Sequence, residues 1–331
     1  MTITVAVTGA GGPSGISFMR AVEAPDVRLI AADIDVYAAG LYLVPEDRRW
    51  LVHRGSDARF VDDMLARCAE EHVDVLVPTV DTELLPLARW RNEFLACGTR
   101  LLVASESTLA ICLDKSLTVA ACADACPVPR TALVDRTFDV DSWPLPFLIK
   151  PRAGAGGRGV LVIERAEDLV CPRDGQYIAQ EFLPGTEYSV DVLSSPACQV
   201  LAAVPRSRLK IDSGIAVAGR TLHEPRLSEF ATAVARRIGL TYVANIQFRE
   251  DRDGLPRLLE INARFPGTMP LTVESGVNMP RIALDMALGR PAPERCGDFR
   301  DVGMVRTWQE HFLSADAFEC VAARAAARVE V

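Results

Sequence analysis

The sequence lacks long apolar runs and an excess of positive charge. None of its apolar segments is long enough to span a bilayer, and its apolar start has no basic segment and is interrupted by glycines. The net charge is −8 at pH 7, which gives no general electrostatic attraction to nucleic acid. We therefore expect a cytoplasmic protein that binds neither membranes nor nucleic acid.

Histidine and paired cysteine are scarce as well. The chain of 331 residues has four His and nine Cys, and no two Cys form a CxxC pair. A chain of this length can form two or three domains with a sizeable core, so it does not need disulfides for stability. The odd cysteine count favours reduced thiols, and a zinc site or a catalytic cysteine is the weaker interpretation.

The first 105 residues alternate between strand and helix patterns. Apolar strand patterns occupy 3–8, 27–35, 73–81 and 99–105, and helix patterns occupy 16–24, 59–72 and 83–96. Such alternation is typical of βαβ units and predicts an open parallel sheet.

The rhythm changes after residue 105. Residues 105–126 have a helical pattern, and two strand–turn–strand units follow at 147–164 and 177–195, which predicts antiparallel sheets. Helices are expected at 279–289 and 315–331. We divide the chain into three parts: 1–105, 106–188 and 189–331.

Polar residues interrupt an apolar strand in the stretch PRLLEINARFPGT, residues 256–268. If Asp253 and Gly254 form a two-residue hairpin turn, one face of the hairpin carries four polar side chains: Asn245, Gln247, Glu260 and Asn262. The other face then carries Ile246, Phe248, Leu259 and Ile261. Oxygen ligands of this kind suit Mg²⁺, which usually takes one or two carboxylates together with phosphates and water. A solvated outer face is the alternative.

A glycine-rich segment, IKPRAGAGGRGV at 149–160, contains Lys150 and four glycines: Gly154, Gly156, Gly157 and Gly159. Glycines let backbone N–H groups approach phosphate oxygens, and cationic side chains neutralise phosphate charge. The segment is not a Walker A loop, and it joins two strands. It is predicted to be a mobile flap over phosphates, with a surface turn as the alternative.

A second glycine-rich turn, Gly9–Gly15, follows the first strand, and Asp33 ends the second strand. This arrangement imitates a dinucleotide-binding fingerprint, although the glycine spacing contains one inserted residue. It supports an alternative function, that of an NAD-dependent oxidoreductase.

Several other charged residues have two interpretations. Arg206, Arg208 and Lys210 either hold a substrate carboxylate or phosphate, or form a solvated edge. Asp81 and Glu83 follow a strand at the end where open α/β sheets bind ligands, so they either orient an amine or stabilise the start of a helix.

Together these motifs resemble the ATP-grasp superfamily, and most closely its branch related to the large subunit of carbamoyl phosphate synthetase. The likeness covers nearly the whole chain, through VTGAGGPSG, LVPTVDTELLPLA, LDKSL, FLIKPRAGAGGRGV, QEFLPGTEYSVD, ANIQF and LLEINARFPGT. It implies an α/β and α+β fold, in which a Rossmann-like pre-ATP-grasp domain precedes a two-lobed ATP-grasp fold. Residues 106–188 would form the lid lobe, and 189–331 the lobe with the metal site.

The resemblance also implies a role for individual residues. Gln247, Glu260 and Asn262 match metal ligands, and Arg264 matches an arginine near the transferred phosphoryl group. Lys115 and Lys150 match cations that touch the ATP phosphates, and Gly156 and Gly157 belong to the flap over them. Glu181, Phe182 and Leu183 match the segment that binds adenine, and Glu187 matches the ribose-binding acid.

The implied activity is that of an ATP-dependent carboxylate–amine ligase that forms an acyl phosphate and releases ADP and phosphate. Its cofactors would be ATP and Mg²⁺, with Mn²⁺ as a substitute, and its partners a small carboxylate and a small amine. The resemblance is compatible with a homodimer. A non-catalytic nucleotide-binding protein is a further alternative, against which the intact metal trio argues.

Overall fold

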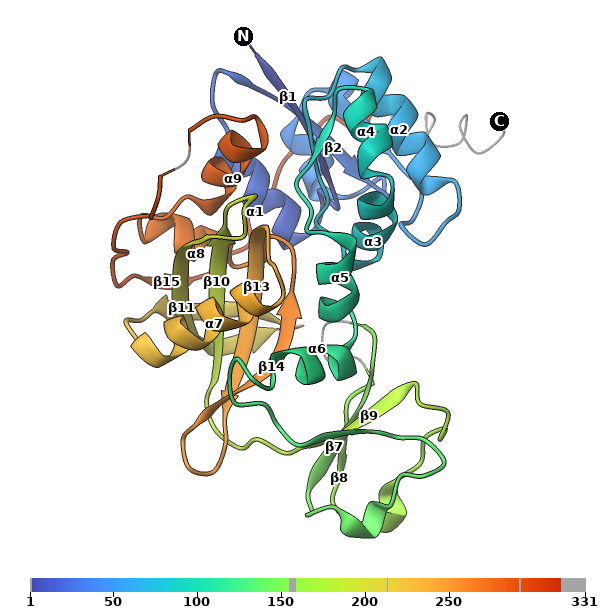
Figure 1. The fold of residues 1–331 in the computed structure, drawn as a ribbon. Coiled ribbons are helices and arrows are strands. Elements are labelled where there is room, and N and C mark those ends of the chain that lie inside the picture. The colour runs from blue at the N-terminus through green and yellow to red at the C-terminus, as the bar shows by residue number, and fades with distance from the viewer. Residues whose placement is uncertain (1, 155–158, 213, 292, 317–331) are drawn as a thin grey trace. The chain divides into compact units, whose positions relative to one another are not determined.

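A computed structural model describes residues 2–154, 159–212, 214–291 and 293–316 (Figure 1). The chain divides into two compact units. The first unit comprises Met1–Ala104, Arg264–Glu294 and Val305–Val331, and the second comprises Ser105–Ala263 and Arg295–Met304. The three-part division expected from the sequence stays a prediction.

The first unit contains a five-stranded sheet in the order β3-β2-β1-β4-β5. Its strands are β1 Ile3–Thr8, β2 Val27–Asp33, β3 Arg49–Leu51, β4 Val75–Val77 and β5 Arg100–Leu101. Every pairing in this sheet is parallel, so the predicted parallel sheet is confirmed. Strand order reverses at β1, and in open α/β sheets this is where ligands bind, at the carboxyl ends of the strands.

Helices α1 to α4, α8 and α9 belong to the same unit. They span Pro13–Val22, Phe60–Glu70, Asp81–Arg89, Arg91–Ala96, Met269–Glu274 and Met279–Ala287, and two 3₁₀ turns span Ala39–Leu43 and Glu46–Arg48. The single helix expected at 83–96 is wrong: α3 begins two residues earlier, and Trp90 separates it from α4. The helix expected at 279–289 is confirmed as α9, whereas most of the one expected at 315–331 lies outside the described residues.

The second unit contains a lid sheet of four strands in the order β6-β9-β7-β8. These strands are β6 Thr131–Leu133, β7 Phe147–Pro151, β8 Leu161–Ile163 and β9 Tyr177–Glu181, and 3₁₀ turns lie at Val140–Ser142 and Ala166–Asp168. The helical pattern at 105–126 forms two helices, α5 Glu106–Cys112 and α6 Lys115–Cys122. They separate because the Asp114 carboxylate caps α6, accepting hydrogen bonds from the N–H groups of Ser116 and Leu117.

The larger sheet of the second unit has six strands in the order β14-β13-β10-β11-β12-β15. They span Glu187–Ser194 (β10), Val200–Asp212 (β11), Ile215–Thr221 (β12), Tyr242–Glu250 (β13), Pro256–Asn262 (β14) and Gly303–Val305 (β15). Helix α7, Pro225–Arg237, packs against β10 and β11 with an apolar face that includes Leu227 and Val234 (Figure 1). The pairings described in the lid sheet and in this sheet are antiparallel, as predicted. The strand–turn–strand unit expected at 177–195 is wrong, however, because β9 lies in the lid sheet and β10 in this one.

The thiols of the described residues agree with the expectation of reduced cysteine. All eight cysteines in this part of the chain are free. Burial raises the pKa of Cys68 and of Cys126 to about 12, so these thiols stay protonated and unreactive at neutral pH. Both side chains are part of the core.

Candidate functional site

The hairpin of β13 and β14 brings the predicted polar residues together. Gln247 pairs with Glu260, and Asn245 pairs with Asn262, so all four side chains lie on one face of the sheet. The Nδ2 atom of Asn262 donates a hydrogen bond to Glu260 Oε1 at 3.2 Å. The predicted face is therefore confirmed.

The predicted two-residue turn is wrong. Glu250 pairs with Pro256, and the loop is closed where Asp251 N–H donates to the Leu255 carbonyl at 3.0 Å. Gly254 adopts a φ of 75°, as in the common three-residue hairpin loop. This loop shifts the strand pairing by one residue near the turn.

A β-bulge at Leu259 compensates for that shift. The register changes between Gln247 and Phe248, because Phe248 pairs with Leu258 while Gln247 pairs with Glu260. Leu258 is fully buried and Leu259 only partly, so the core residue expected at 259 lies at 258 instead. The bulge keeps Glu260 and Asn262 on the polar face.

The polar face continues onto β10 and β11. Asp191 is completely buried and accepts hydrogen bonds from Arg206 Nη2 at 2.5 Å and from Asn245 Nδ2 at 2.7 Å. Gln247 Nε2 in turn donates to Asn245 Oδ1 at 3.3 Å. Arg206, for which the sequence left two interpretations, is thus part of a buried ion pair. Sequence reasoning missed Asp191 as a residue of this face. The signal was its position two residues after Ser189 on β10, since such residues lie on the same face of a sheet.

Arg208 connects two of the predicted site residues. Its Nη1 atom donates to Glu187 and also to Gln247 Oε1, the latter at 3.2 Å. Lys210 is exposed and follows an irregularity in the β11–β12 register. No hydrogen bond described for this part of the chain links it to Arg208, Glu187 or Gln247.

Lys150 lies within electrostatic reach of Glu260, one of the metal-ligand candidates. It is on β7 and only 7% exposed. Burial lowers the pKa of Lys150 to about 8, while Glu260 opposes the shift and Lys115 adds to it. Lys150, Lys115 and Glu260 are therefore close enough to interact electrostatically.

Lys115 anchors the start of the glycine-rich segment. Its backbone N–H donates to the Arg152 carbonyl at 3.0 Å, and its Nζ donates to the Gly154 carbonyl at 2.6 Å. Arg152 also pairs with Asp114, the residue that caps α6. Gly156 and Gly157 lie outside the described residues.

The predicted adenine-binding segment begins at the end of β9. The N–H of Glu181 donates to the Arg130 carbonyl at 2.9 Å, and the Glu181 carboxylate accepts from the Arg130 N–H at 3.1 Å. Leu183 is buried, and Phe182 is partly buried. These bonds tie Glu181 to Arg130, the residue just before β6.

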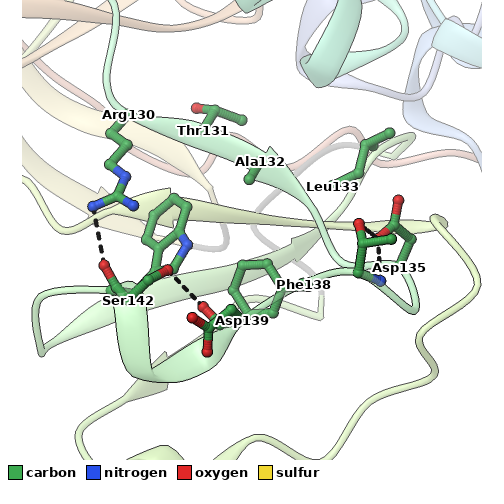
Figure 2. Close-up of a pocket in the computed structure, with 10 residues that line it drawn as sticks. Arg130, Thr131, Ala132, Leu133, Asp135, Phe138, Asp139 and Ser142 are labelled. Atoms are coloured by element: carbon green, nitrogen blue, oxygen red, sulfur yellow. Dashed lines mark hydrogen bonds between the residues drawn. The ribbon is translucent and has the colours of Figure 1, made fainter.

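A hollow of about 430 Å³ is lined by Arg130, by β6 and by the segment that follows it (Figure 2). The Arg130 guanidinium lies over the Trp143 ring at 4.5 Å and donates to the Ser142 carbonyl at 3.3 Å. None of the residues predicted from the sequence lines this hollow.

The Gly9–Gly15 turn uses its own backbone donors. The N–H groups of Ala10, Gly11 and Gly12 donate to the Ala32 carbonyl, to Asp33 Oδ2 and to the Gly9 carbonyl. Pro13, which has no N–H, begins α1. Because a dinucleotide fingerprint depends on such donors and on a ribose-binding acid, this turn is poorly suited to NAD.

Asp81 and Glu83 have different surroundings, although both lie in the first turn of α3. Asp81 pairs with Arg264, Nε to Oδ1 at 2.7 Å and Nη2 to Oδ2 at 3.3 Å. Glu83 is 3% exposed and accepts a hydrogen bond from the Thr8 hydroxyl. Burial raises the pKa of Glu83 to about 7. Sequence reasoning missed the pairing of Asp81 with Arg264.

The donor set of the β13–β14 face fits a hard cation that is shared with phosphates. Within the described ranges, no group of three or more His, Cys, Asp or Glu could hold a metal on its own. Glu260, Asn262 and Gln247 supply one carboxylate and two amide oxygens, so much of the coordination would come from phosphate and water, as Mg²⁺ prefers. In the part of the chain that the structure covers, no helix has both the length and the apolar character that a membrane crossing needs.

Two family models match the chain. The model described as ATP-grasp in the biosynthetic pathway with Ter operon matches residues 174–310, and the PylC-like N-terminal domain model matches residues 7–102. The first model covers most of the six-stranded sheet, including the polar hairpin face, and the second covers the five-stranded parallel sheet. Over residues 174–310 the chain is therefore similar to ATP-grasp proteins. The narrower placement beside carbamoyl phosphate synthetase stays a prediction.

A curated relative is similar over part of its length. A D-alanine–D-alanine ligase of Anaeromyxobacter dehalogenans is 30% identical over 205 residues, which cover 56% of this chain and 63% of that ligase. The chain spans 51–63% of the length of the first four such ligases that it matches. The similarity agrees with the match to the ATP-grasp family model.

Solved structures share the fold. The biotin carboxylase domain of Hydrogenobacter thermophilus 2-oxoglutarate carboxylase, in complex with MgADP, ADP and bicarbonate, has a TM-score of 0.72 and 15% identity. The alignment covers 91% of this chain and 72% of the biotin carboxylase chain. An L-amino acid ligase from Bacillus licheniformis has a TM-score of 0.67 and 16% identity, over 88% of this chain and 75% of its own.

Proposed function

We propose that this protein is an ATP-dependent carboxylate–amine ligase that works through an acyl phosphate and releases ADP. The observation that carries the proposal is the shared face of Gln247, Glu260 and Asn262, with the buried Lys150 in electrostatic reach of Glu260. Hard oxygen ligands beside a desolvated ammonium suit a magnesium–triphosphate complex. The match to the ATP-grasp family model and the similarity to D-alanine–D-alanine ligases support the same class of reaction.

The nucleotide would bind along the second unit. Lys150 and Lys115 would neutralise phosphate charge, and Glu187 would accept hydrogen bonds from the ribose. Because the Glu181 N–H already bonds to the Arg130 carbonyl, adenine recognition would rest mainly on the backbone of Phe182 and Leu183. Gly156 and Gly157 would cover the phosphates. Mg²⁺ held by the metal trio, or Mn²⁺ in its place, would neutralise further phosphate charge.

The chemistry has two balanced steps. A carboxylate oxygen attacks the γ-phosphorus of ATP, the bond from that phosphorus to the β–γ bridging oxygen breaks, and ADP leaves. An amine nitrogen then attacks the carbonyl carbon, the bond from this carbon to the phosphorylated oxygen breaks, and phosphate leaves with that oxygen. The chain's cations would stabilise charge on the transferring oxygens, which is the main demand of phosphoryl transfer. Arg264 is proposed to be one of them.

The two alternatives have less support. An NAD-dependent oxidoreductase would need the backbone donors of the Gly9–Gly15 turn, and those of Ala10, Gly11 and Gly12 are already engaged. A non-catalytic nucleotide-binding protein would not need all of Gln247, Glu260 and Asn262.

A screen for ADP release tests the proposal. The protein is incubated with Mg²⁺ and ATP against panels of small carboxylates and amines, and we expect release above background only when one of each is present. Glu260→Ala should remove this activity, whereas Glu229→Ala, a change of an exposed glutamate on α7, should not. An active Glu260→Ala variant with saturating Mg²⁺ would reject the site.

A further inference from the structure

Asp81 holds Arg264 through two contacts. Arg264 Nε and Nη2 donate to the two carboxylate oxygens at 2.7 Å and 3.3 Å, so one edge of the guanidinium matches the carboxylate. The side chains are 26% and 18% exposed, which makes this pair less screened than a typical surface ion pair. The residues are 183 positions apart in the sequence.

The backbone that carries Asp81 is firmly fixed. Asp81 is the first residue of α3 and follows β4, at the edge of the parallel sheet where ligands bind in such folds. The Thr79 hydroxyl donates to the Thr8 carbonyl at 2.8 Å, inside the core. Gly9 packs so closely that a Cβ there would lie 2.5 Å from Val80 Cγ2. The start of α3 also favours a carboxylate at Asp81.

The backbone that carries Arg264 is fixed by contacts of the residues that follow it with α1. Phe265 is 2% exposed, and its ring packs edge-to-face on Phe18 of α1 with centroids 4.7 Å apart. The Gly267 carbonyl accepts a hydrogen bond from the Ser17 hydroxyl at 3.2 Å. With both backbones held, the two contacts to Asp81 orient the guanidinium, together with a longer contact of 3.5 Å from Arg264 Nη1 to the Phe265 carbonyl.

We propose that Asp81 is a positioning residue, which orients the Arg264 guanidinium toward an anionic group during the reaction. This inference rests on the proposed ligase function. Both oxygens of Asp81 bond to one edge of Arg264, so the proposal assigns Asp81 to this guanidinium and not to the amine. Holding a flexible guanidinium in one orientation removes the entropy loss that it would otherwise suffer on contact with a phosphoryl group. Misplacing such a group by about 1 Å can lower a rate by about 100-fold.

A double-mutant cycle tests this role by steady-state kinetics. We expect Asp81→Asn to lower kcat by about 10- to 100-fold, with KM for ATP changed by less than about twofold. Asp81→Glu should recover part of that loss, because it keeps the carboxylate. Asp81→Ala combined with Arg264→Ala should be no slower than Arg264→Ala alone, since the first residue acts through the second.

A matched control separates positioning from general stability. Asp63 pairs with Arg67 on α2, Oδ1 to Nε at 2.8 Å, with no predicted link to the reaction. Asp63→Asn should leave kcat unchanged. If Asp81→Ala does not fold, Asp81→Asn and Asp81→Glu still report on the role.

The outcomes distinguish this inference from the proposed function. If Glu260→Ala abolishes ADP release but Asp81→Asn leaves kcat unchanged, the positioning role is rejected and the ligase stands. The positioning role would also be rejected if the losses in kcat from Asp81→Ala and Arg264→Ala multiply in the double variant. Such losses would show that the two residues act independently. A wild-type protein without ADP release on any substrate pair would reject both.

Discussion

Arg208 lies against Gln247, and its Nη1 donates to Gln247 Oε1 at 3.2 Å. The same nitrogen donates to Glu187. A divalent cation that used the Gln247 oxygen would compete with this guanidinium, whereas Glu260 brings a full negative charge to the same face. We therefore expect the three metal-ligand candidates to contribute unequally.

Substitution of each ligand candidate tests this ranking. Glu260→Ala should lower kcat by at least about 1,000-fold and Asn262→Ala nearly as much, because charge neutralisation at the phosphates is worth several kcal/mol. Gln247→Ala should lower kcat by about 10-fold and should raise the Mg²⁺ concentration needed for half-maximal rate. The measurement is a Mg²⁺ titration of ADP release at saturating ATP. Equal losses in all three variants would contradict the ranking.

Lys150 should show opposite effects on stability and binding. A buried ammonium is costly to desolvate, so Lys150→Met should raise the free energy of unfolding by about 1–3 kcal/mol. The same change should remove the rise in melting temperature that ATP and Mg²⁺ give the wild type, because ligands of the native state stabilise it. Thermal unfolding with ATP, and with NAD as the negative control, measures both effects. A variant that is less stable yet still responds to ATP would contradict this account.

Glu83 should make stability depend on pH. Its folded-state pKa, about 7, lies above the usual 4.5, mainly because of burial, with Asp33 and Asp81 adding to the shift and Thr8 opposing it. The stabilisation by protonated Glu83 is complete below pH 4.5 and is lost as the pH rises through about 7. From pH 5 to pH 8 the free energy of unfolding should therefore fall by about 2–3 kcal/mol.

Glu83→Gln provides the comparison, since glutamine can still accept from the Thr8 hydroxyl. Denaturant unfolding at pH 5 and pH 8 should show a smaller loss of stability in the variant than in the wild type. The same loss in both proteins would mean that Glu83 is ionised in the folded state at both pH values.

The sequence predicted the parallel sheet and the polar hairpin face because both depend on local alternation. The two-residue turn was wrong, yet Glu260 still faces Gln247, because the bulge at Leu259 offsets the longer loop. Alternation on a half-buried strand restricts register strongly, whereas turn length does not follow from Asp-Gly alone.

Pairings between distant segments could not be predicted in the same way. The Asp191–Arg206 ion pair depends on how β10 aligns with β11, and Asp81–Arg264 joins segments 183 residues apart. No local pattern encodes such contacts, since each depends on tertiary packing. The sequence identified Arg264 through its motif, but it could not show which carboxylate holds it.

The fate of a labelled carboxylate oxygen tests the central claim most directly. With a substrate carboxylate that carries heavy oxygen, attack on the γ-phosphorus makes that oxygen the bridge of the acyl phosphate. We predict ADP as the nucleotide product and one labelled oxygen in the released phosphate, measured by mass spectrometry, and neither product with Glu260→Ala. AMP as the product, or unlabelled phosphate formed together with ADP, would contradict the account.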